Sequence, residues 1–165
     1  MPMIDQLIIG DKASFDDFEA SVAFRTIGLP EKKTIKETVP FSNVTYDFSK
    51  INGELYWNER ELEYVFEIVA QTPERLEDLK AAFASWVMNI HQEELHDPFI
   101  PDHHFVATFS KIKFDDEEGL NKTTATVVFA SYPYKVANLP RVFERTVTGA
   151  VEMYVVNNSS HPIAI

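Results

Sequence analysis

RELEYVFEIVAQTPERLEDLKAAFASWVMNI, residues 60–90, decides the fold, because this stretch joins two elements of different periodicity. In residues 60–70 every second residue is apolar, which predicts a strand with one face in the core and a partly acidic opposite face. The core-facing set is Leu62, Tyr64, Phe66 and Ile68. Thr72 is then a suitable N-cap, and Pro73 suits the first position of a helix. Apolar residues at helical spacing follow in one stripe: Leu76, Leu79, Phe83, Trp86, Val87 and Ile90.

Further strand-like segments lie on both sides of this strand and helix. They are Leu7 to Ile9, Val22 to Phe24, Thr34 to Val39, Val44 to Phe48, His104 to Asp115, Lys122 to Ala130, Val142 to Thr148 and Ala150 to Val156. An acidic turn, residues 115–119, joins two of them into a hairpin, whereas residues 91–103 read as a polar crossing interrupted by Pro98 and Pro101. The order has no repeated βαβ alternation, so we expect an α+β fold. The expected architecture is a mainly antiparallel split β-barrel or sheet flanked by one amphipathic helix, about residues 73–90.

The composition excludes several classes of protein. The 165 residues contain no cysteine, which rules out a disulfide scaffold, thiolate metal sites and a cysteine nucleophile. The net charge of −11 argues against static binding to nucleic acid or to an anionic membrane. The chain begins without a basic stretch and a long apolar core, so no secretory signal is expected. The longest apolar run, residues 126–130, is far short of the ~20 residues that span a bilayer.

Four histidines fall close together beside several carboxylates, a mixture of ligands that binds divalent metals. They are His91, His96, His103 and His104. Their spacing matches no known metal motif, and the prolines break the local geometry. The sequence alone therefore favours a polar connection between helix and strand over a metal site or a metal-dependent hydrolase.

Motifs for catalysis and for phosphate binding are absent, and the five glycines leave little material for them. Neither enzymatic activity nor a cofactor is expected. Glu61, Glu63 and Glu67 share one strand face, which is more typical of an exposed or interfacial surface than of a catalytic acid.

Aromatic residues leave a second alternative open. Six of them lie in segments that also carry polar turns: Phe24, Phe41, Tyr46, Phe48, Tyr56 and Trp57. We expect most of them to be buried in the core, although a carbohydrate-binding surface or a subunit interface would use the same residues. Tyr132 and Tyr134, on either side of Pro133, are candidates for an interface.

The order of several segments resembles the N-terminal, ring-forming domain of the distal tail proteins of phages with long, non-contractile tails. The matching features are a proline-ended strand, a short strand with an aspartate, a glycine turn, an arginine-initiated strand, a helix ending near a tryptophan, and a hairpin that closes in a Pro-Tyr segment. Here they are Val39-Pro40, Thr45 to Phe48, Asn52-Gly53, Asn58 to Arg60 with its strand, Leu79 to Trp86, and Phe129 to Tyr134. The resemblance covers residues 39–135, and this chain departs from it at residues 41–44, where the family often has glycines.

The resemblance implies a structural protein of the virion tail tip or baseplate, made in the host cytoplasm. Members form a hexameric ring, sometimes two rings, that joins the tail tube to the tip or receptor-binding proteins, with DNA only in transit and no membrane partner. Residues 1–149 would be the ring domain, and residues 150–165 a terminal strand or the start of a galectin-like domain, as in a truncated or short member. Either the face with Glu61, Glu63 and Glu67 or the hairpin of residues 31–37 would then line the lumen, where acid repels DNA phosphate. The three glutamates could instead lie at an interface, as could Tyr132 and Tyr134.

Overall fold

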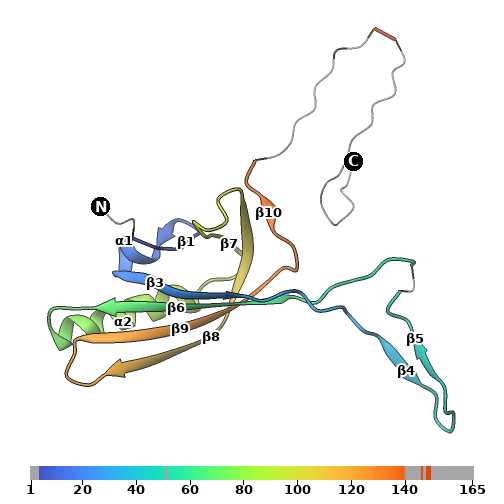
Figure 1. Cartoon of the computed structure of the whole chain (residues 1–165), viewed down its shortest axis with the longest axis horizontal. Coiled ribbons are helices and arrows are strands. Elements are labelled where there is room, and N and C mark those ends of the chain that lie inside the picture. The colour runs from blue at the N-terminus through green and yellow to red at the C-terminus, as the bar shows by residue number, and fades with distance from the viewer. Residues whose placement is uncertain (1–3, 51, 140–145, 147, 150–165) are drawn as a thin grey trace.

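The computed structural model describes residues 4–50, 52–139, 146, 148 and 149. It contains a large antiparallel sheet, one long helix on a face of that sheet, and a two-stranded arm that projects from one end (Figure 1). The elements in chain order are β1 Ile8–Ile9, β2 Lys12–Ala13, α1 Ser14–Phe18, β3 Ala20–Ile27, β4 Lys36–Thr38, β5 Thr45–Asp47, β6 Arg60–Val69, α2 Pro73–Met88, β7 Glu93–His96, β8 His103–Glu117, β9 Lys122–Ser131 and β10 Val136–Ala137. The α+β class and the antiparallel pairing expected from the sequence are confirmed.

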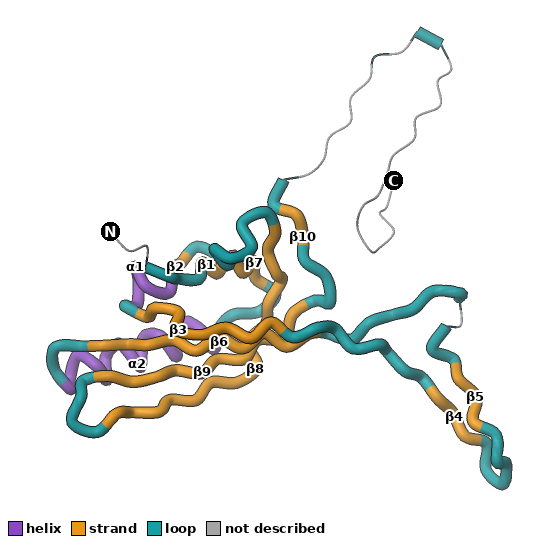
Figure 2. Tube along the Cα trace, in the orientation of Figure 1, coloured by secondary structure: helices purple, strands orange, loops and turns teal. Residues whose placement is uncertain are grey.

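The main sheet has the strand order β2-β1-β7-β8-β9-β6-β3, and β10 pairs with β8 beside this path. Its ladder does not close into a barrel, because β2 and β3 remain at the two ends. One backbone hydrogen bond, from the Val22 N–H to the Asp5 C=O at 2.8 Å, joins β3 to the segment before β1. The tube in Figure 2 shows how the sheet curves so that β1 and β7 lie over the body formed by the longer strands.

The core lies between α2 and the face of β6 that the sequence predicts to be apolar. Leu62, Tyr64, Phe66 and Ile68 are all fully buried. Phe83 of α2 meets Phe66 edge-on, with 5.1 Å between the ring centroids. The helix begins as expected, since the Thr72 hydroxyl accepts a hydrogen bond from the Arg75 N–H at 3.2 Å. Local capping and burial of one helical stripe together fix this helix on the sheet.

Four short elements were not expected from the sequence: the two-residue strands β2 and β10, helix α1 and strand β7. Helix α1 has only five residues, and β7 lies inside residues 91–103, which the sequence predicts to be a polar crossing. Of the four residues of β7 only Leu95 is buried, so the sequence of β7 lacks the alternation of apolar and polar residues that indicates a strand. Because of β7, this crossing is part of the sheet.

Parts of the expected C-terminal region lie outside the described residues. These are residues 140–145, 147 and 150–165, which include nearly all of the two segments expected at 142–148 and 150–156 and the whole of the expected second unit. Among the described residues, no helix combines the length and the apolar character needed to cross a membrane.

Candidate functional site

The arm, residues 29–59, connects β3 to β6 and extends away from the main sheet (Figure 2). Its base is held by backbone hydrogen bonds between the two legs, from the Asn58 N–H to the Glu31 C=O and from the Lys33 N–H to the Tyr56 C=O, both 2.8 Å. Farther out, β4 pairs with β5 in antiparallel register, with Glu37 opposite Tyr46. The sequence correctly predicts both strands, but the residues between them, 39–44, form the outer turn, so Asn52-Gly53 belongs to the returning leg.

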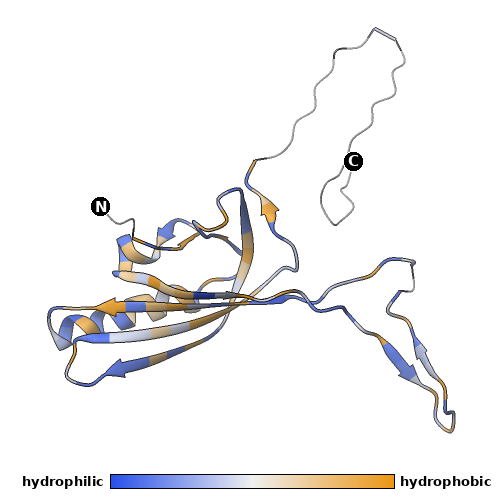
Figure 3. Cartoon of the chain, viewed as in Figure 1, coloured by the Kyte–Doolittle hydropathy of each residue, from blue (hydrophilic) through white to orange (hydrophobic). Residues whose placement is uncertain are grey.

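The expectation that most of the six aromatic residues are buried is wrong. Phe41 is fully exposed, and 50% of Tyr46 and 37% of Trp57 are exposed. The same holds for Phe24 of β3 and for Phe48 and Tyr56 of the arm. No second layer formed by the described part of the chain covers the two legs, so the alternation of apolar and polar residues in them produces no buried face. Figure 3 shows apolar stretches along this projecting arm. Exposed apolar surface of this kind marks sites of association with another surface.

The acidic face of β6 is not uniformly negative. The strand register places lysines of neighbouring strands on the same face as these glutamates. Glu63 of β6 lies opposite Val128 of β9, and Val128 lies opposite Lys111 of β8, so Glu63 and Lys111 share that face. Lys122 of β9 pairs with Glu67 at 3.1 Å and with Glu117 at 3.3 Å. Glu61 is exposed, and Glu63 is half-buried. The face therefore carries alternating charges rather than a continuous acidic surface.

The segment with Tyr132 and Tyr134 is held against the start of β6. The Arg60 guanidinium donates a hydrogen bond to the Pro133 carbonyl, and it also lies over the Phe105 ring at 5.6 Å from the centroid. Burial lowers the pKa of Arg60. Tyr132 is 42% exposed, whereas Tyr134 is half-buried. Two separate parts of the sequence resemblance, the arginine-initiated strand and the Pro-Tyr segment, are thus in direct contact.

The structure brings together two of the four histidines. The side chains of His96 and His104 lie with Glu94, and one ligand atom of each is within 4.8 Å of the others. His96 Nε2 is 3.2 Å from one Glu94 carboxylate oxygen, and His104 Nε2 is 3.8 Å from the other. His91 and His103 do not belong to this group. In the sequence, Glu94 is only one of several carboxylates near the histidines, because the grouping of Glu94, His96 and His104 depends on the pairing of β7 with β8.

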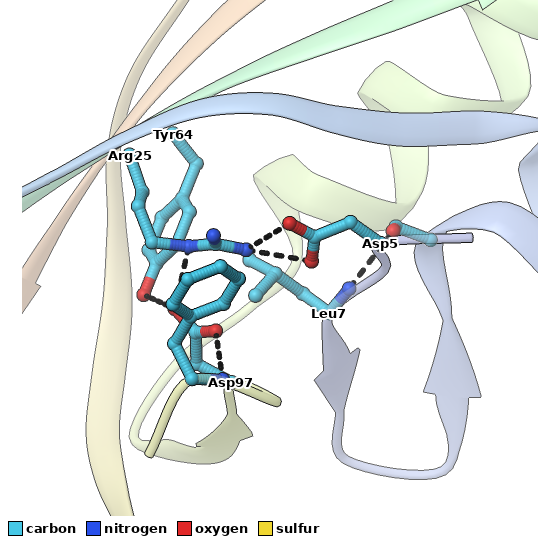
Figure 4. A network of polar contacts seen from close by, with 7 residues as sticks. Asp5, Leu7, Arg25, Tyr64 and Asp97 are labelled. Carbon is cyan, nitrogen blue, oxygen red and sulfur yellow. Dashed lines mark hydrogen bonds and ion pairs between the residues drawn. The ribbon is translucent and has the colours of Figure 1, made fainter. Parts of the chain in front are cut away.

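A partly buried polar network joins four parts of the chain, and no pattern in the sequence indicates it (Figure 4). Arg25 of β3 contacts both carboxylate oxygens of Asp5 at 2.6 Å, and its Nε lies 3.1 Å from Asp97 Oδ2 as an ion-pair contact. The Tyr64 hydroxyl donates to the same Asp97 oxygen at 3.0 Å. Burial, reinforced by the neighbouring Asp97 charge, raises the pKa of Tyr64. The network fixes the N-terminal segment, β3, β6 and the loop after β7 relative to one another, so it is a structural feature of the body.

The fold of this chain is similar to that of a phage hub protein. The similar structure is the Dit protein (gp 19.1) of SPP1, described as a paradigm of the hub adsorption apparatus in phages that infect Gram-positive hosts. The TM-score is 0.60 at 11% sequence identity, over 78% of this chain and 50% of that one. The chain thus spans about half the length of the protein that it resembles.

A second structure, the tail of an empty GTA particle with C6 symmetry, aligns at a TM-score of 0.37 and 13% identity, over 73% of this chain and 84% of that one. A score this low adds nothing to the fold comparison. No protein-family model matches the chain. No curated protein sequence matches it either. The comparisons therefore establish similarity of fold.

Proposed function

We propose that this protein is a structural component of a phage tail tip, where copies form a ring, as the sequence resemblance implies. The observation that carries this proposal is the arm, which presents large apolar side chains that the rest of the described chain does not cover. A head-to-tail contact between identical subunits closes into a ring when the rotation between them is suitable. The arm of one copy would bind the body of the next copy in such a ring.

The fold similarity to the SPP1 Dit protein supports the same proposal. Following the resemblance, the ring is a hexamer that joins the tail tube to the tip or receptor-binding proteins and lets DNA pass. Glu61 and Glu63 are the candidates for the lumen, because Glu67 is already paired with Lys122. Tyr132, which is exposed beside the base of the arm, is a candidate for an interface residue.

The test is the mass of the full chain in solution, measured by light scattering and by native mass spectrometry. We expect a defined ring of identical subunits for the natural sequence. A variant with Phe41→Ser, Tyr46→Ser and Trp57→Ser should be monomeric, because it removes apolar side chains from the arm alone. The matched control is Leu120→Ser, which replaces an exposed apolar residue at the β8–β9 turn and should leave the ring intact. A natural sequence that stays monomeric, or an arm variant that still forms the ring, would refute the proposal.

A further inference from the structure

The pairing of β7 with β8 places Glu94, His96 and His104 on one face of the sheet. Glu94 lies opposite Val106 and Leu95 opposite Phe105, so the same register continues to His96 opposite His104. Glu94 and His96 are two residues apart, and side chains at this spacing share a face of a strand. Side chains directly opposite each other across an antiparallel pair have Cβ atoms about 4.5–5.5 Å apart. The cluster thus follows from the backbone register, and the centroids of the two imidazole rings are 5.1 Å apart.

Asn138 fixes the orientation of His104. The Asn138 amide nitrogen donates to the Pro101 carbonyl at 2.7 Å, which directs its Oδ1 toward the histidine. The distance from this oxygen to His104 Nδ1 is 2.7 Å. An amide oxygen only accepts hydrogen bonds, so Nδ1 must carry a proton. In the neutral ring, Nε2 then has a free lone pair, which faces the Glu94 carboxylate.

A histidine held in this way has the arrangement found in metal sites, where the ring nitrogen that does not bind the ion donates to an oxygen. We propose that Glu94, His96 and His104 bind a divalent transition-metal ion, with zinc as the ion to test. Two imidazoles and a carboxylate are ligands that zinc accepts. The ligand atoms around a tetrahedral zinc ion stand about 3.4 Å from one another. His96 Nε2 is already 3.2 Å from one Glu94 oxygen, and one ligand atom from each of the three residues lies within 4.8 Å of the others, so small side-chain shifts would complete the set.

The burial of the three residues is compatible with an ion that enters from solvent. The side chain of His104 is 9% exposed, that of His96 is 36% exposed, and that of Glu94 is 62% exposed. Glu94 is therefore free to move toward the two rings as the ion binds. Three protein ligands leave a fourth position of a tetrahedral ion for water or for a donor from outside the chain.

The ion would connect the short strand β7 to β8 beside the point where β10 pairs with β8. Leu95 of β7 is in the core, but the strand has only four residues. Ligands on both strands would restrain this pairing whether or not a ring forms. The inference is thus independent of the proposed function.

The test is calorimetric titration of the full chain, without an affinity tag, with zinc chloride at neutral pH. We expect one saturable site per chain. His96→Ala and Glu94→Gln should each weaken binding at least about tenfold, as loss of a ligand or of its support does in known sites. Both residues are accessible to solvent, so these variants should fold, which circular dichroism would verify. The matched control is His91→Ala, an exposed histidine outside the cluster that should leave zinc affinity unchanged.

Substitution of Co²⁺ for Zn²⁺ provides a second readout, because the visible spectrum of cobalt reports its ligands. The natural sequence should give a spectrum of a bound ion with nitrogen and oxygen ligands, and His96→Ala should change it. Asn138→Ala should weaken zinc binding by about 10–100-fold while leaving all three ligands in place. The absence of a saturable site would overturn the inference. Unchanged affinity in His96→Ala and Glu94→Gln, or an equal loss in His91→Ala, would overturn it as well.

Discussion

Asp97→Asn should destabilise the body strongly, because Asp97 is the acceptor at the centre of the partly buried polar network. Its side chain is only 1% exposed. One carboxylate oxygen accepts from the Phe99 N–H at 3.0 Å, and the other faces both the Tyr64 hydroxyl and the Arg25 guanidinium. Asparagine has the same shape but only one oxygen. In either orientation of the amide, its NH₂ group is directed at a donor.

The expected cost follows from these contacts. Breaking a buried ion pair by removing one partner costs about 3–5 kcal/mol. One guanidinium nitrogen of Arg25 keeps its contacts with both carboxylate oxygens of Asp5, and Arg25 is 16% exposed, so its charge is not left without a partner. We therefore expect a loss of about 3 kcal/mol in the free energy of unfolding, at the lower end of that range. For a chain of this size, that loss lowers the melting temperature by roughly 6–12 °C.

Urea unfolding at neutral pH, followed by circular dichroism, measures this loss. Tyr64→Phe removes a single hydrogen bond and should cost about 1 kcal/mol. In the double variant the two costs should not add, because both changes remove the same contact. Asp102→Asn, an exposed carboxylate in the same loop, is the matched control and should change stability by less than about 0.5 kcal/mol. If Asp97→Asn costs less than about 1 kcal/mol, or if the double variant is additive, the network does not stabilise the body as argued.

Three further predictions concern the same body. Burial and the Asp97 charge raise the pKa of the Tyr64 hydroxyl, so above about pH 10 the unfolded chain releases the hydroxyl proton while the folded protein keeps it. The free energy of unfolding should therefore fall above about pH 10, by up to about 1.4 kcal/mol per pH unit. Urea titrations at a series of alkaline pH values should show this slope, and it should be smaller in Tyr64→Phe, where the raised pKa values of Lys80 and Lys122 still contribute. Thr72→Ala, which removes the acceptor for the Arg75 N–H, should cost about 1 kcal/mol in the same assay, whereas Thr72→Ser should cost little. Gly28→Ala should lower the melting temperature, because the new Cβ would be only 2.6 Å from the Glu61 carbonyl oxygen; an unchanged value would contradict this account of the arm's base.

The elements that the sequence predicts well are those whose signals are local. Strand β6 and helix α2 each show their own periodicity, and the Thr72 cap lies within the same stretch. Strand β7 has one buried residue among four, and helix α1 is a single turn with two neighbouring carboxylates. Neither has enough residues for a periodic pattern. They form because longer elements provide the surfaces on which they pack.

The candidate sites depend on contacts between distant residues, which explains why the sequence located them only partly. Spacing along the chain cannot separate His96 and His104, which share a ligand cluster, from His91 and His103, which do not. The register of β7 against β8 makes that distinction. The alternation at residues 45–48 likewise suits a buried strand or an exposed one, and only the position of β5 beyond the edge of the body decides between them.

The arm is not needed to connect β3 to β6. Ile27 and Leu62 are already paired, so a tight turn could join these strands. A loop as long as the arm costs about 2 kcal/mol more in closure entropy than a turn of a few residues. Among residues 29–50 and 52–59, none contributes to the hydrophobic core, so burial in the body does not offset this cost. The apolar side chains of the arm are therefore best explained by contacts beyond the residues that the structure describes, and in the proposed ring a neighbouring copy would provide them at every position of a closed assembly.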